Sequence, residues 1–245
     1  MNGIAERSVV WNLWHGCYKF SEGCRYCYVY RGDAKRNVDS SVVVKTKNFD
    51  LPVRTNKNGS FKIPSRTLVY TCFTSDFFVE DADAWRTEAW EMIRQRSDLH
   101  FLMITKRINR VMECLPADWK DGYDNVTVCC TVENQLCADN RLPVYKAIPI
   151  KHKIIICEPL LEEISLDAYN IGEWVEQVVA GGESGYEARI CNFDWIMKLH
   201  DICVKNNVSF WFKQTGSKFV KEGTLYTVKR QFQHSQARKA GINFK

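Results

Sequence analysis

Short apolar runs recur along the chain at a nearly regular interval, and this recurrence limits the fold more than any other feature. The runs are SVVWNLW (8–14), TLVYTCF (67–73), HFLMIT (100–105), NVTVCCTV (125–132), KIIIC (153–157), EQVVAGG (176–182) and VSFWF (208–212). They are rich in the β-branched and aromatic residues of buried strands. Continuous apolarity, without alternation, is typical of parallel strands covered on both faces. From the second run onward the runs return every 23 to 33 residues, which is the spacing of a βα repeat.

Segments with helical periodicity lie between these runs. Residues 81–97 carry an apolar stripe and begin with Asp81 and Asp83, either of which can cap a helix. Residues 193–207 carry a second stripe, and shorter helices are expected in 107–115 and 134–145. The pattern predicts an α/β fold with parallel strands, a full or partial (β/α) barrel, with a doubly wound open sheet as the alternative.

Polar side chains follow the predicted strands and are the first candidates for a functional site. They are Thr74, Ser75 and Asp76, Lys106 and Arg107, Glu133 and Asn134, Glu158, Glu183 and Ser184, and Lys213 and Gln214. In a barrel the carboxyl ends of all strands meet at one mouth, where such residues surround a single site. A buried strand must end in polar residues in any case, and this explanation without a function accounts for about half of these residues when each is considered alone. Glu158 is harder to explain so, because it stands inside IIICEPLL, and a carboxylate between apolar residues needs a partner or a function.

Composition and the amino terminus restrict the class of protein. Hydrophobic residues form 45% of the 245 residues, which is too apolar for a disordered chain and enough for one large domain or two small ones. The first residues, MNGIAERSVV, lack the apolar run of a secretory signal, and no stretch reaches the length of a membrane span. We therefore expect a cytoplasmic protein without membrane contact, in which the 11 cysteines are metal ligands or buried thiols rather than disulfides.

Positive charge is concentrated near the carboxyl terminus. The net charge is +5, and residues 216–245 hold seven basic residues against Glu222 alone. We predict a barrel domain over 1–215 and a short basic C-terminal extension over 216–245. This extension and the basic residues 45–66 can contact phosphates. They can equally be solvated loops and a frayed tail, and we favour that reading because no nucleic-acid-binding motif accompanies them.

Three cysteines follow the first apolar run in the segment GCYKFSEGCRYCYVY. Cys17, Cys24 and Cys27 have the spacing C-x6-C-x2-C and occupy the first predicted βα loop. A four-iron cluster held by three thiolates keeps one iron open for a small molecule. A structural zinc site needs a fourth ligand, for which His15 is the nearest candidate. The other cysteines look like core residues: Cys72, Cys129, Cys130 and Cys157 in strands, and Cys114, Cys137 and Cys203 on helices, while Cys191 has no assigned role.

At these residues the sequence resembles the radical S-adenosylmethionine (radical SAM) superfamily, whose usual signature is C-x3-C-x-aromatic-C after the first strand of the barrel. Cys24, Tyr26 and Cys27 match the second half of that signature, and the longer spacing from Cys17 departs from the first half. Within the superfamily the chain looks like a phage-associated, largely uncharacterised group of radical-SAM-like proteins. That likeness runs from Trp11 to about Gly216, through WN, GC, GCRYCY, SD, ITKR, TVENQ, CEPLL, GGESG with Arg189, and FKQTG.

The resemblance implies a partial TIM-type (β/α)6 barrel with a [4Fe-4S] cluster on Cys17, Cys24 and Cys27. It implies that S-adenosyl-L-methionine binds the open iron and that a one-electron reductant of the flavodoxin or ferredoxin type drives its cleavage to a 5′-deoxyadenosyl radical. That radical abstracts hydrogen from a substrate. The expected cofactor-binding residues are Tyr26, Thr74, Ser75, Asp76, Asn134, Gly182 and Glu183, and the expected catalytic residues are Glu133, Glu158 and Lys213.

Neither the substrate nor the class of protein follows from these residues alone. A nucleic-acid substrate and a peptide substrate are both open. Two other classes also remain: a zinc-stabilised module that binds nucleic acid, and a non-catalytic barrel that serves as a scaffold for a partner. The three hypotheses differ in the metal content that they predict.

Overall fold

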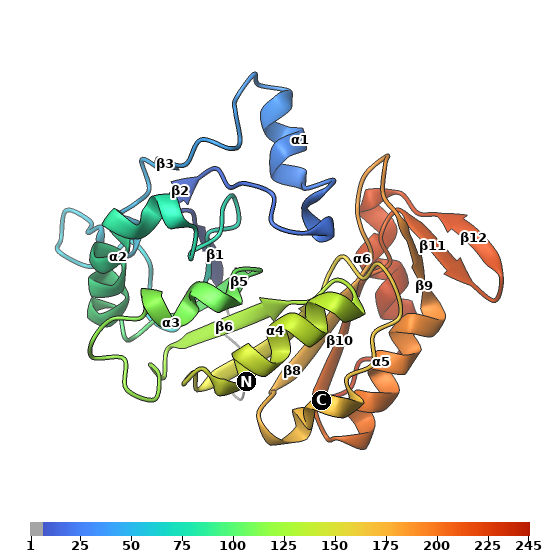
Figure 1. Ribbon diagram of the computed structural model, residues 1–245. Coiled ribbons are helices and arrows are strands. Elements are labelled where there is room, and N and C mark those ends of the chain that lie inside the picture. Colours follow the sequence, from blue (N-terminus) through green and yellow to red (C-terminus); the bar gives the residue numbers. More distant parts are fainter. Residues whose placement is uncertain (1–6) are drawn as a thin grey trace. The chain divides into compact units, whose positions relative to one another are not determined.

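The computed structural model describes residues 7–245 (Figure 1). The chain forms two compact units. The first comprises the described part of Met1–Tyr18 with Gly32–Cys129 and Ile148–His152, and the second comprises Lys19–Arg31, Cys130–Ala147 and Lys153–Lys245.

The first unit is built on parallel strands. It contains β1 (Ser8–Trp11), β2 (Trp14–His15), β3 (Val44–Lys45), β4 (Leu68–Thr71), β5 (His100–Thr105) and most of β6 (Val126–Thr131), with helices α2 (Asp83–Gln95) and α3 (Val111–Cys114). β4 pairs in parallel with β1 and with β5, whereas the short strands β2 and β3 pair antiparallel. Its core is aromatic, with Trp11 against Phe101 and Phe77 against Trp90, all of them buried.

The second unit also has a parallel centre. It contains α4 (Gln135–Ala147), nearly all of β7 (His152–Cys157), β8 (Gln177–Gly181), β9 (Ile190–Asn192), α5 (Phe193–Lys205), β10 (Ser209–Gln214), β11 (Lys218–Lys221), β12 (Thr224–Thr227) and α6 (Arg230–Lys239). Helix α1 (Tyr28–Ala34) begins in this unit. β8 pairs in parallel with β7 and with β10. Figure 1 shows β8 and β10 side by side. Helix α5 packs on β8 and β10 and buries Ile196, Leu199 and Cys203.

All seven predicted strands are confirmed. In the first unit β1, β4 and β5 are neighbours in that order, and in the second unit β7, β8 and β10 are neighbours in that order. A doubly wound sheet reverses its strand order at a switch point, and neither of these described sets of strands contains such a reversal. The α/β class and the parallel strands are therefore confirmed, and the strand order within each unit differs from that of a doubly wound sheet at its switch point.

Two local predictions are wrong. Neither Asp81 nor Asp83 caps helix α2, because a 3-10 turn over Glu80–Ala82 leads into the helix and Asp83 instead pairs with Arg110 at 2.9 Å. The basic segment 216–245 is folded and is not a frayed tail. β11 pairs in parallel with β9 and antiparallel with β12, and helix α6 packs on β10. None of the helices within residues 7–245 is long and apolar enough to cross a membrane.

Candidate functional site

The eleven cysteines divide into two groups by burial. Cys17, Cys24 and Cys27 are half-buried, and the other eight are buried, seven of them as predicted for core residues and the eighth being Cys191, which had no assigned role. All eleven are free thiols. Cys17 belongs to the first unit, whereas Cys24 and Cys27 belong to the second. Among residues 7–245, no group of three or more His, Cys, Asp or Glu side chains is arranged to hold a metal ion.

In the first unit, a glycine turn leads the chain into Cys17. Gly16 has a φ of +97°, and a Cβ atom there would lie 2.2 Å from the carbonyl oxygen of Val42, so only glycine fits. The Gly16 amide donates to the carbonyl of Thr74 at 3.1 Å, and the Ser75 hydroxyl donates to the carbonyl of Gly16. Thr74 and Ser75, which were predicted to bind a cofactor, thus hold the backbone beside Cys17.

Asp76 is the buried carboxylate at the end of β4. It accepts hydrogen bonds from the Thr105 hydroxyl at 2.8 Å and from the backbone amides of Phe78 at 3.0 Å and Lys106 at 3.2 Å. These bonds connect the residues after β4 to the end of β5. They supply Asp76 with the partners that a buried carboxylate needs.

Arg107 is one of the polar residues that follow the predicted strands, and it had no specific predicted role. Its guanidinium is 2% exposed and lies 3.3 Å from the sulfur of Cys17, 3.4 Å from Asp76 and 2.9 Å from the carbonyl oxygen of Tyr18. Burial lowers the pKa of Arg107, but the charges of Asp76 and Cys17 outweigh this effect, so its pKa is raised. A guanidinium at this distance favours the thiolate form of a cysteine. The available signal was its position directly after the run HFLMIT.

His15, the proposed fourth ligand of a zinc site, is already engaged in the first unit. Its Nε2 atom lies 2.7 Å from the carboxylate of Asp33, which is fully buried. Burial raises the pKa of Asp33, but hydrogen bonds from Ser40, His15 and Arg36 outweigh it and hold the pKa below its usual value. Only the Nδ1 atom of His15 remains for another ligand.

In the second unit, Glu133 anchors the segment that carries Cys24. Its carboxylate is 0% exposed, accepts from the Ser21 hydroxyl and the Gly23 amide, and pairs with Arg141 at 2.7 Å. A Cβ atom on Gly23 would lie 2.9 Å from that carboxylate, so the glycine allows the close approach. The neighbouring Asn134 accepts from the Cys137 amide at 2.8 Å, in the manner of an N-cap of helix α4.

Glu183 holds the same segment from the end of β8 through an arginine. Glu183 is buried and accepts from Arg189 at 2.8 and 2.9 Å, and Arg189 also donates to the carbonyl of Glu22 at 3.0 Å. The hydrogen bonds to Glu183 raise the pKa of Arg189 above its ordinary value. The guanidinium groups of Arg25 and Arg189 each lie over the ring of Tyr26, 5.3 Å from its centre.

Gly182 is required by packing inside the second unit. A Cβ atom at this position would lie 2.3 Å from the carbonyl oxygen of Thr215 and 2.9 Å from Cβ of Cys191. Cys191, which had no assigned role, lies in β9 and is fully buried. Burial raises the pKa of the Cys191 thiol to about 12, with a smaller contribution from the charge of Glu158. Cys191 is therefore a core thiol and is not a reactive one.

Glu158 and Lys213 form a partly exposed acid–base pair at the ends of β7 and β10. Their side chains lie 2.7 Å apart and are 15% and 35% exposed. Gln214 also donates to Glu158, and its own oxygen accepts from the Ser184 hydroxyl at 3.0 Å. Arg31 donates to the carbonyl of Ser184 at 2.6 Å, which ties helix α1 to the same cluster. The carboxylate that stands among apolar residues in the sequence therefore has partners and still reaches solvent.

The strand ends of each unit thus bring polar residues together around a cysteine segment. A protein-family model described as "Protein of unknown function (DUF5131)" matches residues 2–243. No curated protein and no solved structure matches the chain.

Proposed function

We propose that this chain, which belongs to the DUF5131 family, is an iron–sulfur enzyme of the radical SAM type. Its cluster ligands would be Cys17, Cys24 and Cys27. When bound, the cluster and S-adenosyl-L-methionine supply a carbon-centred radical that abstracts hydrogen from a substrate, and the protein supplies binding, orientation and exclusion of water.

One observation carries the proposal. Of eleven free cysteines, the three with the C-x6-C-x2-C spacing are those that keep contact with solvent, while the other eight are buried. Thiolates are the usual ligands of iron–sulfur clusters, and a ligand must be accessible to the metal. The sulfur atoms of these cysteines are therefore suitable donors for a cluster. Their assignment to one ligand set is based on their spacing in the sequence.

The charged residues support this proposal by positioning the ligands. In the first unit, Arg107 lies against the sulfur of Cys17. In the second unit, Glu133 and Glu183 hold the segment around Cys24 through Ser21, Gly23 and Arg189, in contacts confined to that unit. We assign Glu133, Glu183 and Asp76 to positioning, because each carboxylate is buried and bonded to protein groups.

The Glu158–Lys213 pair is then the best candidate for contact with a substrate. Glu158 and Lys213 were both predicted to be catalytic, their charged groups lie 2.7 Å apart, and both side chains are partly exposed to solvent. In such a pair the carboxylate can accept a proton from a bound molecule, and the ammonium can donate one. We also infer that the sequential strand order belongs to a partial TIM-type barrel, in which strand ends surround one mouth.

Iron analysis of anaerobically purified protein tests the proposal. We expect a brown protein with about four irons per chain, and cleavage of S-adenosyl-L-methionine after reduction. Replacing Cys17, Cys24 and Cys27 by alanine should abolish iron binding, whereas the matched variant Cys137→Ala should retain it. A colourless protein with one zinc would favour the zinc-stabilised module, and an iron-free protein that stays folded in the triple variant would favour the scaffold.

A further inference from the structure

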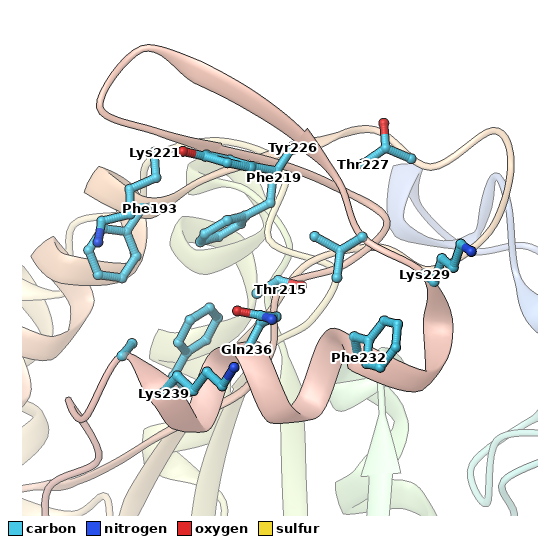
Figure 2. A pocket seen from close by; sticks show the side chains of 13 residues that line it. Phe193, Thr215, Phe219, Lys221, Tyr226, Thr227, Lys229, Phe232, Gln236 and Lys239 are labelled. Carbon is cyan, nitrogen blue, oxygen red and sulfur yellow. The ribbon is translucent and has the colours of Figure 1, made fainter.

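A pocket lies in the basic carboxyl-terminal part of the second unit, between the β11–β12 hairpin and helix α6 (Figure 2). Its volume is about 630 Å³, which is in the usual range for a pocket that holds a small molecule or one nucleoside. None of the strand-end residues predicted for catalysis lines it. The pocket is therefore separate from the residues of the proposed reaction.

Aromatic rings form much of its wall. Phe212 and Phe219 stack with ring centres 5.9 Å apart, and Phe193 meets Phe219 edge to face at the same distance. Tyr226 and Phe232 also line the pocket and are 49% and 47% exposed. Phe212 and Phe219 are buried, whereas about half of the surface of Tyr226 and Phe232 reaches solvent, so these two rings can stack against a bound molecule.

Lysines provide the charge of the pocket. Lys221, Lys229 and Lys239 line it, and none of the described lining residues is acidic. Within residues 7–245, neither Lys229 nor Lys239 forms a salt bridge, whereas Lys221 lies over the ring of Phe193 and 3.8 Å from Glu222. The surrounding segment 216–245 is the part of the chain in which basic residues most outnumber acidic ones. An occupant with planar rings and negative charge matches this composition.

We propose that this pocket binds single-stranded nucleic acid, with one unpaired base against Phe232 and Tyr226 and the flanking phosphates on the lysines. Base–aromatic stacking combined with cationic side chains is the usual means of binding single strands without sequence preference. Duplex bases are already stacked and are not available to the pocket. An apolar helix fits less well, because it would bury three lysine side chains in a pocket that has no acidic lining residue, and burying a charge without a partner is costly. The proposal does not depend on the cluster.

Binding of a fluorescein-labelled single-stranded oligonucleotide, measured by anisotropy at about 50 mM salt, tests the proposal. We expect Phe232→Ala to weaken binding about tenfold, and Phe232→Trp to restore it. Lys229→Gln combined with Lys239→Gln should reduce the slope of log Kd against log salt concentration by about 1.4, or about 0.7 for each phosphate that is no longer neutralised. The same sequence as a duplex should bind more weakly.

Matched variants keep the test specific. Tyr186→Ala removes an aromatic side chain that is 97% exposed and lies outside the pocket, and it should leave binding unchanged. Lys47→Gln with Lys57→Gln removes two charges from the other basic segment and should change the salt dependence less. The proposal is wrong if no single strand binds, if Phe232→Ala binds like the parent protein with the same circular dichroism, or if an acidic peptide or a duplex binds equally well.

Discussion

The first unit brings a cation to the sulfur of a cysteine, whereas the second unit directs its charged groups at the backbone and neighbours of its cysteines. Arg107 lies 3.3 Å from the sulfur of Cys17, and Asp76 lies beside it. Glu133 and Arg189 instead bind Ser21, Gly23 and Glu22, the residues that precede Cys24. Charged residues therefore lie against a thiol in one unit and against the backbone and neighbours of the cysteines in the other.

The largest expected effect concerns the buried pair that anchors the second unit. Arg141→Met should lower the free energy of unfolding by about 3–5 kcal/mol, because Glu133 would remain buried without its counter-ion. Urea denaturation measures this change. The control Lys198→Met breaks the exposed pair with Glu163 and should cost at most about 1 kcal/mol. Equal losses in the two variants would show that the Glu133 pair is not an anchor.

The next effect concerns the reactivity of Cys17. In metal-free protein, Arg107→Met should slow alkylation of Cys17 by iodoacetamide about tenfold, because the guanidinium favours the reactive thiolate. Peptide mass spectrometry reports the rate at each cysteine, and Cys24 serves as the internal control. An unchanged or faster reaction at Cys17 would remove the distinction between the two units.

The smallest effect is expected at Glu158. Glu158→Gln should change the free energy of unfolding by less than about 1 kcal/mol, since its pair with Lys213 is partly exposed. Lys213→Gln is the matched variant and should behave similarly. A loss of several kcal/mol on denaturation would mark Glu158 as a structural carboxylate and withdraw it from the proposed substrate contact.

The strands were predictable because buried parallel strands leave a local signal. Each of the seven apolar runs became a parallel strand, as continuous apolarity and βα spacing indicated. The burial of Cys129 and Cys157 followed for the same reason, whereas Cys72, which was also predicted in a strand, is buried directly after the end of β4. The helix cap was not predictable, because Arg86 and Arg110 compete for the carboxylate of Asp83, and that competition depends on tertiary contacts.

Residues 216–245 show the limit of composition as a guide. Their charge suggested a solvated tail, but Phe219 packs on Phe212 and the buried Gln233 bonds to the Ser217 and Ser184 hydroxyls. These partners lie up to 49 residues away from Gln233. A local pattern cannot report contacts between distant segments, whose stability comes from burial in the folded state.

The sequence by itself determined the α/β class, the seven strands and the segment in which three cysteines gather, because periodicity and spacing are properties of neighbouring residues. Only the tertiary structure decided which charges face which groups: Arg107 toward the sulfur of Cys17, Glu133 toward Ser21 and Gly23, and Lys213 toward Glu158. Such pairings join residues separated by 55 to 112 positions. The physical reason is desolvation, because burying a charged side chain costs free energy unless the folded chain places a partner beside it.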